Sequence, residues 1–359
     1  MESNVFLGVA LHAIGGLAAS TCFVPQKGTP NWSYQSFWLL MCLASWLLMP
    51  IGVAFLTVPD LVDVIKESPN DVLVNTTLLG AVYGFGGMAF GLAIRYIGFS
   101  LTYSIAIGIS AILGTVVPGI LNGNLIANFQ KPGGLLVLAG LTVSLLGVAF
   151  CGLAGFRKEK EVSKEGSTFD AKKGTVIVIL AGILSAVFGI SLEQGAPIDA
   201  IAEAKGAGNF QGNAKFIFAM GGAFITNLIW WSVVHFRAKT WKEYTKVPQS
   251  TDGKSGSLPT YLFFGLLAGV LWYCQFFFYG LGHVQMGAFK FISWGIHMSM
   301  LIFFSFGIGL ILKEWSGLSK KVTNTLLVGL AVLLGAFGLI TYGSYIGENS
   351  GTEATSNGH

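Results

Sequence analysis

The sequence predicts an all-α integral membrane protein with ten transmembrane helices. Its 359 residues are 53% hydrophobic and only 11% charged, which is too little charge to cover a water-soluble surface. Apolar runs of about 20 residues, the length that crosses a hydrocarbon core of about 30 Å, recur along the whole chain. Similarities between its two halves further indicate two five-helix repeats of opposite orientation, a 5+5 inverted-topology repeat.

The ten predicted spans are apolar runs separated by polar breaks that contain Pro, Gly and Asn. In order they cover residues 5–23, 36–57, 78–95, 101–121, 134–153, 174–193, 216–236, 259–281, 290–312 and 322–344. No basic segment precedes the first run, so we expect a retained helix and not a cleaved signal. All four cysteines fall inside apolar runs without a CxxC pair, which is typical of small core residues and not of disulfides or metal ligands.

The basic residues predict the orientation. Of the 21 Lys and Arg residues, 16 lie after spans 1, 3, 5, 7 and 9. The positive-inside rule assigns those breaks to the cytoplasm and both termini to the outside. Membrane topology thus explains the net charge of +4, and we expect a lipid bilayer and no nucleic acid as partner.

An internal repeat predicts the domain organisation. Gly15 of span 1 corresponds to Gly182 of span 6, and Gly80 of span 3 to Gly265 of span 8. Because five helices is an odd number, the second copy must be inverted, as in many secondary transporters. Chance matching among glycine-rich helices is the alternative. The predicted parts are a first repeat (1–156), a basic cytoplasmic loop (157–173), a second repeat (174–346) and a disordered tail (347–359).

Polar side chains inside spans predict a binding site, because they are costly to insert into lipid. His12, Gln275 and His297 lie at a similar depth from the outer ends of their helices, about 10 Å for the histidines. Amides, imidazoles and hydroxyls beside aromatic rings suit a sugar. Helix–helix hydrogen bonds and interfacial aromatic belts are the alternative explanation. The predicted substrate-binding residues are His12, Tyr83, Trp272, Tyr273, Gln275, Tyr279, Ser293, Trp294 and His297.

The residues predicted to serve proton coupling or gating are Glu193, Lys290 and His297. Glu193 and Lys290 lie at the outer ends of spans 6 and 9 and could pair there, or both could extend to lipid headgroups. Glu193 is the best-placed carboxylate for proton exchange, whereas His297 and His12 are rivals because imidazole titrates near neutral pH. No Walker, HExxH or GxSxG motif is present, so we expect neither an enzyme nor a metal or other cofactor.

Several stretches along the chain form a family pattern. Besides His12 and Ser100, they are Arg95-Tyr96-Ile97-Gly98, Ile105-Ala106-Ile107-Gly108-Ile109, Gly114-Thr115, Asn122-Gly123-Asn124, Trp272-Tyr273, Gln275-Phe276-Phe277-Phe278-Tyr279, Gly282-His283, Ile292-Ser293-Trp294, His297-Met298-Ser299 and Lys313-Glu314-Trp315. Together they resemble the L-rhamnose-proton symporter family of the drug/metabolite transporter superfamily over nearly the whole chain. The resemblance implies a ten-helix inverted-repeat fold, a bacterial cytoplasmic membrane and proton-coupled uptake of a 6-deoxyhexose. In such a membrane the two termini that the basic residues place outside would be periplasmic. Lys290 and Glu193 depart from the family pattern.

The leading hypothesis is therefore a proton-coupled transporter of L-rhamnose or a related 6-deoxyhexose that works by alternating access. A uniporter or exchanger of another sugar or small metabolite is the alternative within transport. A non-transporting membrane sensor is a third possibility, which the lack of a soluble domain disfavours.

Overall fold

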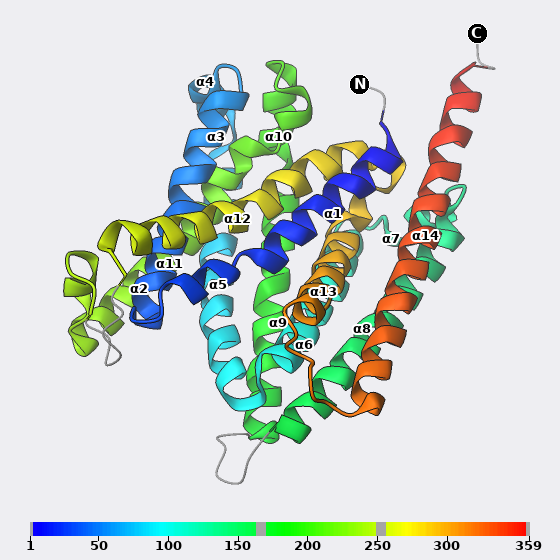
Figure 1. Cartoon of the computed structure of the whole chain (residues 1–359). Helices are drawn as coiled ribbons and strands as arrows, with labels where there is room; N and C mark the ends of the chain where they lie inside the picture. The colour runs from blue at the N-terminus through cyan, green and yellow to red at the C-terminus, as the bar shows by residue number, and fades with distance from the viewer. Residues whose placement is uncertain (1–2, 163–169, 249–255, 357–359) are drawn as a thin grey trace. The chain divides into compact units, whose positions relative to one another are not determined.

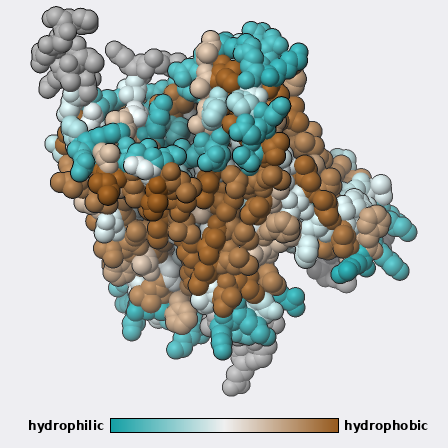
Figure 2. All heavy atoms as spheres, turned by 180° about the vertical axis from the view of Figure 1, so that it is seen from behind, coloured by the Kyte–Doolittle hydropathy of each residue, from teal (hydrophilic) through white to brown (hydrophobic). Residues whose placement is uncertain are grey.

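The computed structural model describes residues 3–162, 170–248 and 256–356, and all regular structure in these ranges is helical. Within these described ranges, ten helices are long and apolar enough to cross a membrane, in agreement with the predicted number of spans. Each of the ten overlaps one predicted apolar run. Many large apolar side chains are exposed, including Leu56, Leu135 and Ile126, and hydrophobic residues cover a broad part of the face in Figure 2. Such a surface fits lipid and not water.

The chain forms two compact units, each built from segments far apart in sequence. Unit 1 comprises Met1–Leu17, Gly86–Ile190 and Phe278–His359, and unit 2 comprises Ala18–Phe85 and Ser191–Phe277. Four helices contribute residues to both units: α1 (Val5–Thr21), α5 (Asn70–Ile97), α9 (Ala171–Gln194) and α12 (Leu258–Gln285). These helices are the predicted spans 1, 3, 6 and 8.

Unit 1 also contains α6 (Phe99–Leu121), α7 (Leu125–Gln130), α8 (Gly134–Val162), η5 (Gly287–Ile292), α13 (Ser293–Ile311) and α14 (Lys320–Ser356). Helices α8 and α14 lie side by side along most of their length (Figure 1). Glycines allow this approach: a Cβ at Gly140 would lie 2.9 Å from the backbone nitrogen of Ile340. A buried hydrogen bond of 2.7 Å from Ser144 to Ser299 joins α8 to α13. The sequence predicts a disordered tail at 347–359, whereas helix α14 continues as far as Ser356.

Unit 2 contains the broken second span and the helix α11 (Asn213–Ala238). The span consists of α2 (Tyr34–Cys42), a π-helical segment η2 (Leu43–Leu48) and α3 (Met49–Thr57). Pro50 has no N–H group to donate to the preceding turn, and the hydrogen-bond ladder widens just before it. Helices α5 and α11 approach closely at Gly80, where a Cβ would lie 1.9 Å from the carbonyl oxygen of Ala219.

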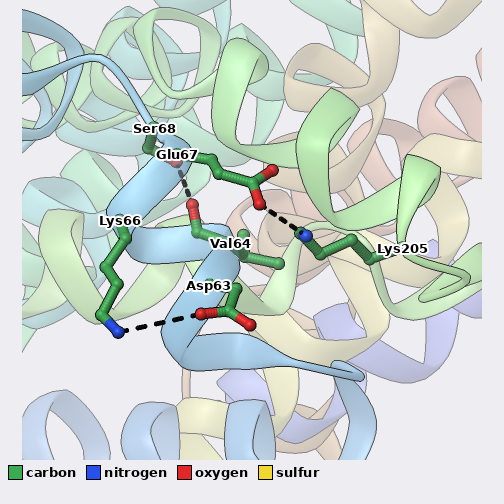
Figure 3. A network of polar contacts seen from close by, with 6 residues as sticks. All are labelled: Asp63, Val64, Lys66, Glu67, Ser68 and Lys205. Atoms are coloured by element: carbon green, nitrogen blue, oxygen red, sulfur yellow. Dashed lines mark hydrogen bonds and ion pairs between the residues drawn. The ribbon is translucent and has the colours of Figure 1, made fainter.

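Short amphipathic helices in two breaks were not predicted. They are α4 (Leu61–Glu67) and α10 (Ala196–Ala204), which bury Val64 and Ile198 against each other in a small apolar core. Lys205 and Glu67 form an ion pair of 2.7 Å between them (Figure 3). The hydrogen bond to the Glu67 carboxylate raises the pKa of Lys205. The remaining short segments are η1 (Val24–Gly28), η3 (Gly208–Phe210) and η4 (Trp241–Tyr244).

Candidate functional site

In unit 1, four of the predicted site residues come together around Tyr279 of α12. The Tyr279 ring lies 5.6 Å from the ring of His12, 5.4 Å from that of His297 and 5.7 Å from that of Trp294, measured between centroids. The rings of His12 and His297 are themselves 5.6 Å apart. Helices α1, α12 and α13 each contribute to this group, which we call the imidazole cluster (His12, Tyr279, Trp294 and His297). Residues far apart in sequence therefore share one buried location.

Both histidines are fully buried, with no exposed surface. Within the described parts of the chain, neither ring nitrogen of His12 or His297 has a hydrogen-bond partner. Buried polar atoms of native proteins nearly always have a protein or water partner. The two rings thus have unused capacity to donate and accept hydrogen bonds.

Glycines bring the helices close enough for this arrangement. A Cβ at Gly282 would lie 2.9 Å from the carbonyl oxygen of Gly8 and 3.1 Å from Nδ1 of His12, so a larger residue here would push α12 away from α1. Gly16 plays the same role between α1 and α13, where a Cβ would meet the backbone of Leu301 at 3.1 Å. The positions of the two imidazoles are therefore determined by close helix packing.

The Trp294 side chain is fixed by a hydrogen bond and by close packing against neighbouring helices. Its Nε1 donates to the carbonyl oxygen of Ser110 at 3.0 Å and lies 3.3 Å from the Ser110 hydroxyl. Gly114 and Gly189 flank the indole, because a Cβ at either would come within 3.1 Å of it. The Trp294 N–H is thus already used, and its ring can offer only an apolar surface. The adjacent Ser293 hydroxyl is buried and makes no hydrogen bond within the described residues.

His283 also belongs to this region, although it was not among the predicted site residues. Its ring stacks on Tyr279 at 5.8 Å. The signal was available, since His283 follows Tyr279 by four positions and therefore shares its helix face. In the part of the chain that the structure describes, no group of three or more His, Cys, Asp or Glu side chains could hold a metal ion.

In unit 2, Trp272 lies in a cluster of aromatic rings. Its ring is 6.0 Å from that of Trp38, 6.1 Å from that of Trp46 and 5.6 Å from that of Phe23. Trp46, which the π-helical turn of η2 carries, also contacts Tyr83 at 5.9 Å. The Trp272 Nε1 is buried and has no hydrogen-bond partner within the described residues.

The other predicted residues of unit 2 are buried along α12. Tyr273 is 1% exposed and its hydroxyl finds no hydrogen-bond acceptor or donor in the described ranges, while Gln275 is 4% exposed. Glu193 lies half-buried in α9, in unit 2, and Lys290 is exposed in η5, in unit 1. The pairing expected of Glu193 and Lys290 stays a prediction.

Sequence reasoning missed two polar features of unit 2. Lys215 and Asp199 form a buried ion pair of 2.5 Å, with side chains that are 6% and 13% exposed. Asn227 is fully buried and uses both ends of its amide. Its Oδ1 accepts from Nε1 of Trp38 and Trp231, and its Nδ2 donates to two backbone carbonyls. The sequence did offer a signal for Asn227, because it is a polar residue within an apolar run.

Known proteins resemble this chain along nearly its whole length. The model of the L-rhamnose-proton symport protein (RhaT) family matches residues 1–345. An L-rhamnose-proton symporter of Yersinia pestis (strain Pestoides F) is 33% identical over 345 residues, which cover 96% of this chain and 99% of the relative. The L-rhamnose-proton symporter of Pectobacterium atrosepticum is 31% identical over the same shares of the two chains. The chain therefore belongs to the L-rhamnose-proton symport protein family.

Proposed function

We propose that this protein transports L-rhamnose or a related 6-deoxyhexose together with a proton across a bacterial cytoplasmic membrane. The observation that carries the proposal is the pair of buried imidazoles, His12 and His297, with unused ring nitrogens. Sugar hydroxyls both donate and accept hydrogen bonds, so they complement neutral imidazoles. Tyr279 and Trp294 supply aromatic surface beside them, which suits the apolar face of a pyranose.

The same pair offers a place for one proton. At a separation of 5.6 Å and an effective dielectric constant of about 20, two imidazolium charges would repel each other by about 3 kcal/mol. The pair therefore holds one proton far more readily than two. A membrane potential of 100 mV supplies about 2.3 kcal/mol per proton, enough for roughly fortyfold accumulation of sugar. Glu193 and Lys290 are the competing coupling residues.

We further propose that the chain is a 5+5 inverted repeat of the drug/metabolite transporter type that works by alternating access, with both termini in the periplasm. The unit boundaries support a repeat. They fall at Leu17 and Ile190, in spans 1 and 6, and at Phe85 and Phe277, in spans 3 and 8. These are the two pairs of spans that the sequence repeat relates. Many secondary transporters are built from two repeats, and movement of one repeat against the other exposes the binding site to each side of the membrane in turn.

The experiment is uptake of labelled L-rhamnose into proteoliposomes that carry the purified full chain, with and without an inward proton gradient. We expect gradient-driven accumulation, and its loss in His297→Ala. Glu193→Gln tests the competing carboxylate, with Glu203→Gln as its control, because Glu203 is exposed on α10. Uptake that is indifferent to the gradient would favour the uniporter alternative. No uptake by folded protein would refute L-rhamnose as the substrate.

A further inference from the structure

The paired helices α8 and α14 of unit 1 gather positive charge at one end. The last turns of α8 contain Arg157, Lys158 and Lys160, and α14 begins with Lys320 and Lys321. The two helices lie side by side, with these basic segments at the same end of the pair (Figure 1). In a membrane, the ends of spanning helices lie at the level of the lipid headgroups. Positive charge is therefore concentrated where headgroups border the hydrocarbon core.

A polar contact between the helices aligns their basic residues. Arg157 of α8 donates through Nη1 to the hydroxyl of Thr325 on α14. Lys160 follows Arg157 by three positions and Lys321 precedes Thr325 by four, which are axial steps of about 5 and 6 Å. Because the two helices run antiparallel, both lysines lie beyond this contact toward the same end of the pair. Lys160 and Lys321 thus share one level with positive charge from both helices.

The acidic side chains nearby do not cancel this charge. Glu161 is engaged as an acceptor, since both the N–H of Ser319, at 3.0 Å, and its hydroxyl donate to the carboxylate. Glu159 and Glu314 both attract Lys158, which is half-buried on another side of α8. Glu161 is therefore the one carboxylate that faces the start of α14 among these three.

Four basic residues are left beside that single carboxylate. We call them the basic cluster, which consists of Arg157, Lys160, Lys320 and Lys321. The three lysines are exposed, and none of them forms an ion pair with a residue in the described ranges. Like charges that lie close together repel each other, so a negatively charged partner would stabilise the cluster.

Exposed apolar side chains beside the cluster favour a lipid as that partner. Phe150 and Leu153 precede Arg157 by seven and four positions, so they share its helix face, and they are 38% and 40% exposed. Val328 follows Lys321 by seven positions on α14 and is 46% exposed. We call Phe150, Leu153 and Val328 the apolar stripe. A phospholipid can use both features, whereas a soluble anion would use the charges alone.

We propose that the basic cluster and the apolar stripe together bind one anionic phospholipid. Its phosphate lies at the basic cluster, and its acyl chains lie along the apolar stripe. Each Lys or Arg near an anionic membrane surface strengthens binding about fivefold, so the loss of two lysines should weaken it about 25-fold. The inference does not depend on which solute the protein transports.

The test measures lipid retention by the purified full chain in a neutral detergent. The protein is mixed with equal amounts of phosphatidylglycerol and phosphatidylcholine that carry the same acyl chains, and bound lipid is counted by native mass spectrometry. We expect the wild type to retain phosphatidylglycerol at least tenfold over phosphatidylcholine. Lys160→Gln/Lys321→Gln should reduce this preference at least fivefold. The matched control is Lys242→Gln/Lys246→Gln, which removes two exposed positive charges from unit 2.

Three outcomes would overturn the proposal. The first is equal retention of the two lipids by the wild type. The second is an unchanged preference in Lys160→Gln/Lys321→Gln. The third is an equal loss in the control variant, because total charge and not the basic cluster would then decide retention. Both variants change exposed side chains only, so they should elute from a size-exclusion column as the wild type does.

Discussion

Removal of one partner from the buried Lys215–Asp199 ion pair should strongly destabilise unit 2. The side chains are 6% and 13% exposed, so Lys215→Met leaves a carboxylate that water solvates poorly. Breaking a buried ion pair typically costs about 3–5 kcal/mol. The Asp199 side chain is 13% exposed, so water can still solvate part of the unpaired carboxylate. We therefore expect a loss of about 3 kcal/mol in the free energy of unfolding, which is roughly a hundredfold change in the folding equilibrium constant.

The assay is unfolding in mixed detergent and SDS micelles, followed by tryptophan fluorescence. The double variant Asp199→Leu/Lys215→Met should come within about 1 kcal/mol of the wild type, because apolar replacement of both charges removes the unpaired ion. Lys205→Met is the control, since its ion pair with Glu67 is far more exposed, and little change is expected. The reasoning fails if Lys215→Met is as stable as the wild type, or if the double variant loses as much as the two single variants together.

Three further predictions concern packing, hydrogen bonding and charge in unit 2. Gly80→Ala forces a Cβ against a carbonyl oxygen of α11 and should cost at least about 1–3 kcal/mol in the same unfolding assay, whereas Gly221→Ala, which meets open space, should not destabilise. Asn227→Leu leaves the N–H groups of two buried indoles without their acceptor and should cost about 2–4 kcal/mol, with a changed tryptophan emission spectrum. Glu67→Gln should lower the pKa of Lys205, which can be measured by NMR of its ammonium group. In the wild type the ion pair is present at neutral pH, and it is lost as the pH rises through the raised pKa of Lys205. An unchanged Lys205 titration would contradict this.

Hydropathy sufficed to predict the ten spans because lipid imposes a length and a composition on every crossing helix. The short helices α4 and α10 escaped prediction, since each has only a few apolar residues within a polar break. Val64 and Ile198 become core residues only when the two helices pack on each other. The same limit applies to Lys215 and Asp199, which look like ordinary loop charges until the fold buries them.

The polar layer was partly predictable from depth along the helices. Counting residues from the ends of the spans predicts that His12 and His297 lie at the same depth in the membrane. In the structure the centroids of their rings are 5.6 Å apart. Depth does not give rotation about the helix axis, so it could not show that Trp294 turns its N–H to Ser110. Nor could it show which rings surround Trp272, because the π-helical turn in span 2 rotates Trp46. Helix rotation depends on packing that a single sequence does not encode locally.

The saturated amide of Asn227 has an evolutionary consequence. One side chain satisfies the indoles of Trp38 and Trp231 and ties both to the backbone of two helices. No aliphatic residue can replace it singly without stranding its neighbours. These three positions should therefore vary together in relatives, either all retained or all exchanged. The hydrogen bonds to backbone carbonyls add no constraint of their own on the side chains at the accepting positions.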